Sequence, residues 1–427
     1  MAKPKLALIP AAQGDKFYSV LPSSGVGDFD FTRSGGATRI NSQGLIETVA
    51  DGVSRLNYPL IDGKVVGCPS HLLEPQRTNS IQYSEDFSNS YWTKADTLIT
   101  SNSVISPDGT LNADKLTEGN SISTKLMFKS GISTLGTISV FAKKGDDNNR
   151  LFQIRRDGGS NSWSWFNLED GIILSEENGV STIDKLGNGW YRCSFTPTNS
   201  NGTIVFGISN GGTGRSVSYQ GDETSGVYIF GAQLEQGSFQ TSYIPSLIGS
   251  QTTRSAETAT NSGDASTFND SEGVLMAEIS ALADDGTFRT IAINGTATNV
   301  NTNRVQIYFR DTADIITFGM ESENSAQFFL QFPLDVKSNN KLALKYSANS
   351  CSFWINGIKV GEETNKVMPT ALSRLDFVRQ DGDDEFFYGN TKQIQYYDSA
   401  LTDSELETLT SWVSFSDMAE GQLYTIE

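Results

Sequence analysis

Short runs of alternating apolar and polar residues dominate this chain. Residues 138–142, 151–155, 190–195, 273–279 and 304–310 are rich in β-branched and aromatic side chains, and clusters of Gly, Asn and Asp bound many of these runs. Such runs are typical of strands with one face in a core. No helical period of useful length separates them, so the spacing predicts antiparallel sandwiches or jelly rolls rather than alternating strands and helices.

Two local signals sharpen this prediction. Asn356-Gly357 lies between two apolar runs and favours a two-residue hairpin turn, because both residues tolerate positive φ. Thr402 and Glu405 fit a capping box, and Leu406, Leu409 and Trp412 follow at helical spacing. The sequence therefore predicts one short C-terminal helix lying across one end of the last sandwich.

The distribution of these runs divides the chain into four parts. Residues 1–75 hold only short strands and loops and cannot bury much surface alone, so we expect them to dock on a neighbouring domain or on another chain. Residues 76–250 and 271–427 each read as an antiparallel β-sandwich. Residues 251–270 are polar, almost without core-forming side chains, and read as a linker or a crossing strand. The fold class is all-β.

Composition excludes several partners. The chain has 427 residues, with 50 acidic against 32 basic side chains and a formal net charge of −18, so its surface should repel nucleic acid and anionic lipid. No run approaches the roughly 20 apolar residues needed to span a bilayer, and the start MAKPKLALIP lacks a signal-peptide core. Three widely spaced cysteines indicate folding in a reducing cytosol. We expect a soluble protein without a cleaved signal.

Three segments resemble tailed-phage structural proteins that carry carbohydrate-binding-like and laminin-G-like or concanavalin-A-like domains. The first resembles the beginning of the carbohydrate-binding-like domain and comprises LLEPQRTN at 72–79, YSEDF at 83–87 and Trp92. The second resembles the end of that domain and comprises GAQLEQG at 231–237, TSYIP at 241–245 and Thr253-Arg254. The third resembles the C-terminal half of a laminin-G-like domain and comprises WING at 354–357, Gly389, QYY at 395–397 and LTD at 401–403.

This resemblance implies a virion component: a tail fibre, a tail tip or a head decoration protein, assembled in the host cytoplasm. It implies a carbohydrate-binding-like sandwich over 76–250, a laminin-G-like or concanavalin-A-like sandwich over 271–427, and an attachment or oligomerisation role for 1–75. Other virion proteins are the expected partners, together with a host-surface glycan. A homo-oligomer is expected, with a trimer as one option. The resemblance assigns no particular sugar-contacting residue.

Alternation within two adjacent strands suggests a sugar platform. Phe166 and Leu168 should point to the core with Phe152 and Ile154, which sends the neighbouring polar and aromatic residues to the opposite face. The candidate glycan-binding residues on that face are Trp163, Trp165, Asn167, Gln153 and Arg155. Aromatic planes beside amides suit sugars, because C–H faces stack on rings and polar groups take the hydroxyls. Alternatively, the tryptophans pack under a loop, the N-terminal region or a neighbouring subunit.

A second and weaker platform follows from the same argument. Val305, Ile307 and Phe309 should face a core, so the alternate residues of that strand face outward. These candidates are Gln306, Tyr308 and Arg310.

Signals for catalysis and for metal binding are sparse. His71 is the sole histidine, in a Pro-rich turn, and a lone histidine is more often packed or solvated than catalytic. No cofactor motif occurs. The loop 381–385 holds Asp381, Asp383 and Asp384, whose oxygens suit Ca²⁺, although acidic runs between strands are more often solvated turns.

The leading hypothesis is therefore a non-enzymatic virion protein that presents lectin-like modules for attachment to host glycans. One alternative is a purely architectural decoration protein without a ligand. Another is a tail-associated glycan depolymerase, which would need a pair of carboxylates. Phage depolymerases commonly use long β-helices, and the chain shows no repeat of about 20 to 25 residues that would build one.

Overall fold

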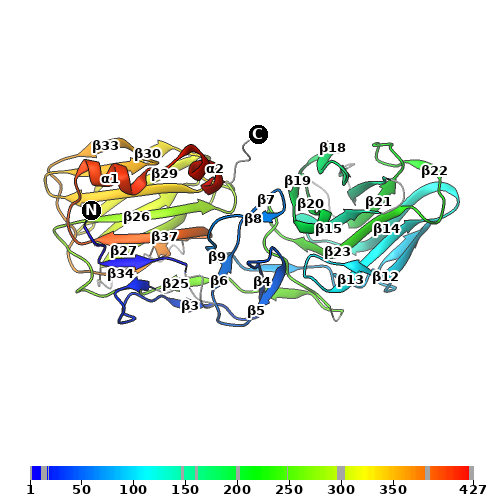
Figure 1. The fold of residues 1–427 in the computed structure, drawn as a ribbon, viewed down its shortest axis with the longest axis horizontal. Helices are drawn as coiled ribbons and strands as arrows, with labels where there is room; N and C mark the ends of the chain where they lie inside the picture. Colours follow the sequence, from blue (N-terminus) through cyan, green and yellow to red (C-terminus); the bar gives the residue numbers. More distant parts are fainter. Residues whose placement is uncertain are drawn as a thin grey trace.

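The computed structural model describes residues 2–422 apart from 11–16, 18, 146–148, 159–161, 199–201, 248, 296–302 and 380–384. Strands make up most of this part of the chain and build two sandwiches that lie side by side along the long axis of the molecule (Figure 1). The all-β fold class predicted from the sequence is confirmed. Neither helix among these residues is long and apolar enough to cross a membrane.

The first sandwich has two antiparallel sheets. In spatial order, one contains β11 (Thr93–Ala95), β14 (Ile122–Ile132), β21 (Gly202–Ser209), β16 (Leu151–Asp157), β17 (Ser162–Asn167) and β18 (Ile172–Glu177), with β22 (Ser218–Gln220) paired to β14. The other contains β12 (Thr97–Ile105), β13 (Leu111–Glu118), β23 (Gly226–Glu235), β15 (Thr137–Lys144), β20 (Trp190–Pro197) and β19 (Gly179–Lys185). A short 3₁₀ turn spans Gly187–Gly189.

Alternation along these strands fills one core between the two sheets. Phe152 and Ile154 of β16 pack there with Phe166 of β17, as their spacing predicts. Trp92, which lies in the segment before β11, is buried against Phe206 of β21.

The second sandwich also has two sheets. In spatial order, one contains β2 (Ser19–Leu21), β1 (Leu6–Leu8), β37 (Gly389–Tyr397), β26 (Glu272–Ala281), β31 (Asn340–Ser347), β32 (Cys351–Ile355) and β33 (Ile358–Glu363), with β9 (Ser70–Leu73) paired to β37 and β6 (Arg55–Asn57) to β9. The other contains β30 (Ser325–Pro333), β29 (Ile315–Ser322), β28 (Asn303–Phe309), β27 (Arg289–Gly295), β36 (Glu385–Phe386) and β35 (Val378–Arg379), with β34 (Leu372–Asp376) on β27.

The hairpin and helix signals are both found in this sandwich. Asn356 and Gly357 have φ of 48° and 85° between β32 and β33, as a hairpin with positive φ at both central residues requires. Helix α1 (Asp403–Thr410) begins at the predicted capping box of Thr402 and buries Leu406 against the outer face of the sheet. A second short helix, α2 (Phe415–Gly421), begins at Ser414 and is not predicted by the sequence pattern.

The N-terminal segment connects the two sandwiches. Strand β1 completes a sheet of the second sandwich and buries Leu6 and Leu8 in its core. The hairpin of β4 (Ala37–Ile40) and β5 (Ile46–Val49) lies instead against the outer face of the first sandwich, where Ile46 packs with Phe141 and Trp190. The segment thus packs against the hydrophobic residues of both sandwiches, and Figure 1 shows β4, β5, β6 and β9 between them.

Three further two-stranded ladders lie around this connection. They are β10 (Arg77–Asn79) with β24 (Thr252–Arg254), β3 (Asp30–Thr32) with β25 (Thr258–Thr260), and β7 (Leu60–Ile61) with β8 (Lys64–Val65). Residues 251–270, which the sequence suggests are a linker or a crossing strand, contain β24 and β25 and the fully buried side chains of Arg254 and Glu257.

Candidate functional site

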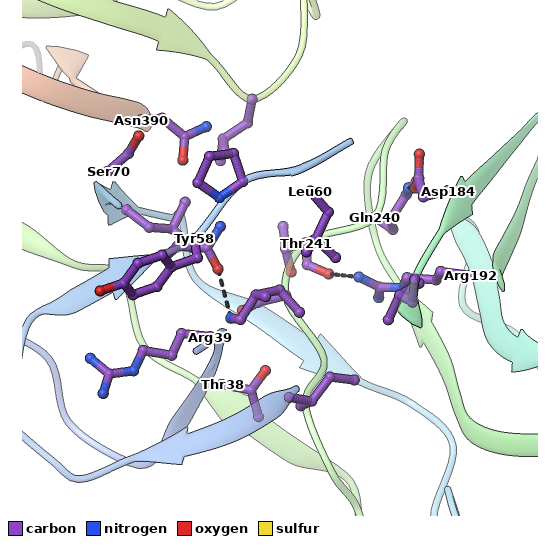
Figure 2. Close-up of a pocket in the computed structure, with 18 of the residues that line it drawn as sticks. Thr38, Arg39, Tyr58, Leu60, Ser70, Asp184, Arg192, Gln240, Thr241 and Asn390 are labelled. Atoms are coloured by element: carbon purple, nitrogen blue, oxygen red, sulfur yellow. Dashed lines mark hydrogen bonds between the residues drawn. The ribbon is translucent and has the colours of Figure 1, made fainter. Parts of the chain in front are cut away.

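A cleft of about 590 Å³ opens where the N-terminal segment meets both sandwiches (Figure 2). One wall comes from the N-terminal segment, a second from β9, β26 and β37 of the second sandwich, and a third from β19 and β20 with the chain that leaves the first sandwich. Its volume falls within the range of roughly 300 to 1,000 Å³ usual for ligand sites.

The N-terminal wall presents Tyr58. The main-chain N–H of Tyr58 donates to Ile40 O at 3.0 Å, while Asn57 Oδ1 accepts from Ile40 N at 2.8 Å, and these bonds fix the wall to β4. The Tyr58 ring is half-buried and lies at the cleft, and its hydroxyl makes no hydrogen bond within the described part of the chain (Figure 2). An aromatic face with an unused hydroxyl is therefore available to a ligand.

The wall from the second sandwich presents Asn390 and Lys392 of β37. Pairing of β37 with β26 shifts register between Glu278 and Ile279, so Lys392 is the extra residue of a β-bulge. A bulge redirects side chains, and here two successive residues, Lys392 and Gln393, turn away from the core. Among the described residues the side chains of Asn390 and Lys392 have no hydrogen-bond or ion-pair partner.

The wall from the first sandwich presents Arg192 and the pair Gln240 and Asp184. Arg192 Nη1 donates to Thr241 O at 2.7 Å and Nη2 to Ser139 Oγ at 3.0 Å, while its Nε has no acceptor in the part of the chain that the structure describes. Burial lowers the pKa of Arg192 even though Glu235 and Asp184 oppose this effect. Gln240 Nε2 donates to Asp184 Oδ2 at 2.9 Å. Arg192 is thus held in place by neutral acceptors.

Beneath the cleft lies a cluster of buried charges, which we call the charged junction: Arg33, Arg55, Glu74, Arg254 and Glu257. Glu74 lies 2.8 Å from Arg55 and 2.7 Å from Arg254, and Glu257 pairs with Arg55 and, at 2.8 Å, with Arg33. These side chains are at most 3% exposed.

Hydrogen bonds tie the charged junction to the chain that leaves the first sandwich. Ser242 donates to Glu74 through its N–H at 2.8 Å and its hydroxyl at 2.6 Å. Burial alone would raise the pKa of Glu74, but Arg254, Arg55 and these bonds outweigh it and lower the pKa to about 2. The charged junction joins segments that are far apart in the sequence; the widest separation is 224 residues, between Arg33 and Glu257. Its ion pairs therefore hold the walls of the cleft in a fixed relation.

The first sugar platform predicted from sequence is largely covered. Trp165 is 2% exposed and donates through Nε1 to Gly214 O at 2.8 Å, and Gln153 and Arg155 both donate to Arg215 O. The loop carrying Gly214 and Arg215 therefore lies over this face, in keeping with the alternative of tryptophans packed under a loop.

The two remaining residues of that platform are only partly covered. Trp163 and Asn167 are half-buried, and Asn167 donates to Asp170 at 2.6 Å. They face the same side of β17 as Trp165.

The second predicted platform is also mostly buried. Gln306 is 1% exposed and Tyr308 9% exposed, with the Tyr308 ring against Phe288 and Phe329. Arg310 is half-buried, lies over Phe288 and pairs with Asp311 at 3.3 Å. Val305, Ile307 and Phe309 fill the core, as their alternation predicts.

The candidate calcium ligands Asp381, Asp383 and Asp384 lie outside the described residues. Within those that are described, no three His, Cys, Asp or Glu side chains are grouped to hold a metal ion. His71 is 1% exposed, stacks on Phe17 with centroids 4.7 Å apart, and has no described residue as a partner for either ring nitrogen. It is a packed side chain away from the cleft.

Sequence reasoning missed Tyr58, Arg192, Asn390 and Lys392 as site residues. They come from three distant segments, and no local pattern distinguishes them from ordinary surface residues. The one available signal was the consecutive polar pair Lys392-Gln393, which breaks the alternation of its strand.

No family model and no curated protein matches the chain. Solved structures resemble about a third of it. The CBM40 of the Ruminococcus gnavus IT-sialidase bound to α2,3-sialyllactose is 18% identical over 34% of this chain and 84% of its own, with a TM-score of 0.28. The leech intramolecular trans-sialidase is 20% identical over 34% of this chain and 24% of its own, also with a TM-score of 0.28.

A third likeness is to domain 4 of AbnA, a GH43 extracellular arabinanase from Geobacillus stearothermophilus, in complex with arabinotriose. It is 14% identical over 36% of this chain and 73% of its own, with a TM-score of 0.29. These TM-scores are too low to support any conclusion about the ligand or activity of this chain.

Proposed function

We propose that this chain is a non-enzymatic virion protein of a tailed phage that binds a host-surface glycan in the cleft. The observation that carries the binding proposal is a set of groups around one cavity that have no partner in the described part of the chain: the hydroxyl of Tyr58, the amide of Asn390 and the ammonium of Lys392. The virion role rests on the resemblance of the segments at 72–92, 231–254 and 354–403 to tailed-phage structural proteins.

The chemistry of the lining suits a sugar. Pyranose C–H faces stack on an aromatic ring such as that of Tyr58, and the hydroxyls exchange hydrogen bonds with amide, guanidinium and carboxylate groups. Asn390, Arg192 and Gln240 provide such groups from two walls. These groups sit on strands or are fixed by neighbouring hydrogen bonds, so little ordering entropy is lost on binding.

The lining supports binding rather than catalysis. It contains no cysteine or histidine. Of its carboxylates, Glu74 is committed to two arginines and Asp184 accepts from Gln240, while Asp62 lies near Lys185. A glycosidase needs one carboxylic acid and one carboxylate placed on either side of a glycosidic bond.

Glycan binding by the full chain tests the proposal. We expect Tyr58→Ala and Asn390→Ala each to weaken binding to a glycan-array hit, or to purified host polysaccharide, by about 3- to 10-fold, the size of one stacking contact or one hydrogen bond. Trp163→Ala is the matched control, because this half-buried aromatic lies on β17 and not in the cleft. Loss of binding in the control alone would move the site to the β16–β17 face.

The place of the chain in the particle is a separate part of the proposal. We expect copies related by symmetry, as a homo-oligomer that contacts other virion proteins, because fibres and head decorations assemble on symmetric positions. Electron microscopy of intact particles would locate the copies at the tail or at the capsid surface. If the chain binds no glycan and the particle still adsorbs normally to its host, a purely architectural role would be favoured.

A further inference from the structure

We infer that the cleft selects glycans that carry carboxylate groups, with Lys392 as the residue that receives the carboxylate. This inference rests on the proposed function and names the ligand class of the same site. The described part of the chain leaves the charge of the Lys392 ammonium unneutralised, because no carboxylate oxygen lies within 4.0 Å of it.

An unpaired lysine at this position stands out against the composition of the chain. Acidic side chains outnumber basic ones by 50 to 32, so a half-buried cation has many potential partners in the fold. Lys392 nevertheless turns into the cleft at the bulge of β37, while its neighbour Gln393 donates to Glu278 Oε2 at 2.6 Å. The Glu278 carboxylate of the adjacent strand β26 is therefore bonded to Gln393.

On the opposite wall of the cleft, a second cation also lacks a carboxylate partner among the described residues. Within the ranges that the structure describes, Arg192 has no carboxylate oxygen within 4.0 Å, and its Nε has no acceptor. Figure 2 shows Arg192 across the cleft from Asn390, which lies two residues before Lys392 on β37. An acidic oligosaccharide that spans the cleft would meet a cation at each side.

Within the described part of the chain, none of the acidic residues of the lining forms a direct ion pair with Lys392 or Arg192. Glu74 already pairs with Arg55 and Arg254 below the cleft, whereas Asp184 accepts from Gln240 and acts on Arg192 only from beyond 4.0 Å. Asp62 and Lys185 form a loose pair at 3.8 Å, and both are exposed. Because a net charge of −18 repels anions at long range, binding of an acidic sugar should depend on these local cations rather than on the overall field.

The test compares each acidic glycan with its own neutral form. The probes are oligogalacturonate, alginate oligomers and hyaluronan oligomers, each with a carboxyl-reduced counterpart, titrated into the full chain by calorimetry at low and moderate salt. For at least one pair, we expect the acidic form to bind about tenfold more tightly than its reduced form. We expect Lys392→Gln to abolish that difference, because it should weaken binding of the acidic form far more than binding of the reduced form.

Controls separate charge at this position from charge in general. Lys129→Gln removes another half-buried lysine, one that lies 4.3 Å from the centre of the Tyr91 ring outside the cleft, and should keep the preference. The melting temperature should be unchanged in Lys392→Gln, because the Lys392 side chain has no partner among the described residues. Titration with dextran sulfate tests whether a sulfate group can replace the carboxylate.

The outcomes distinguish this inference from the proposed function. Equal or tighter binding of the reduced forms overturns the carboxylate preference and leaves glycan binding intact. Equal loss of dextran sulfate and acidic-sugar binding in Lys392→Gln overturns selectivity for carboxylate in favour of any anion. If none of the acidic probes binds, the inference is overturned. If the chain also binds nothing on a broad glycan array, the proposed function is overturned as well.

Discussion

At the scale of single residues, His71 shows how burial decides the role of a side chain. Its ring is enclosed by Phe17, Phe31 and Phe377. Burial, with Arg55 nearby, lowers the pKa of His71 to about 3, so the imidazole stays neutral in the folded protein. Two buried nitrogens that lack partners among the described residues cost stability that an apolar ring would not.

We expect His71→Phe to raise stability and to flatten its dependence on pH. Unfolded His71 takes up a proton below its ordinary pKa near 6.5, whereas the folded form resists protonation down to about 3. Wild-type stability should therefore fall as pH drops through this window. Melting temperatures from pH 7.5 to 3.5 would show the gap between variant and wild type widening toward low pH.

The difference in melting temperature between His71→Phe and wild type separates the contribution of His71 from those of other titrating groups. Glu74, with a pKa lowered to about 2, also loses stability as pH falls below 4.5. Asp114, whose pKa burial raises to about 6, acts in the opposite direction between about 3.8 and 6. Both contributions are present in variant and wild type, so a gap that does not change with pH would contradict the account.

At the scale of elements, the resemblance motifs meet at the ends of the first sandwich. Asn79 of β10 donates to Ala232 O and Ile244 O and accepts from Leu234 N, so one side chain joins the beginning and the end of this domain. Glu74 and Arg254 belong to the same motifs and to the charged junction. The conspicuous sequence signal thus describes a structural closure rather than a ligand site.

This closure could not be derived from the sequence, although the elements it joins could. Period-two alternation predicted strands such as β16 and β28, and Asn356-Gly357 predicted a hairpin, because those signals are local. An ion pair between Arg55 and Glu257 joins positions 202 residues apart, and nothing local marks either partner. The cleft depends on such long-range pairs, which is why its residues were missed.

We expect Glu74→Gln to destabilise the protein by about 3 to 5 kcal/mol. The change leaves Arg254 buried without its direct carboxylate, and an uncompensated buried charge is costly. Glu47→Gln is the matched control: Glu47 pairs with Arg39 at 2.9 Å on the surface and should contribute less than about 1 kcal/mol. Denaturant unfolding measures both, and similar losses would mean that the junction adds no more than a surface pair.

At the scale of the whole molecule, the N-terminal segment makes one unit of two sandwiches. The sequence indicated that residues 1–75 need a core from elsewhere, but not that they would take it from both bodies at once. Leu8 lies in the core of the second sandwich, and Ile46 packs on the outside of the first. The charged junction lies between the sandwiches. Truncation of Leu8 or of Ile46 should therefore destabilise both sandwiches, including the cleft wall that each of them provides.

We therefore expect a single calorimetric unfolding transition that both Leu8→Ala and Ile46→Ala shift downward. Truncation of a fully buried leucine costs about 2 to 5 kcal/mol, and Ile46 is 8% exposed and should cost toward the lower end. Val26→Ala, at an exposed position of the same segment, should leave the transition in place. Two transitions, each sensitive to one anchor only, would show that the sandwiches unfold independently and that the segment does not couple them.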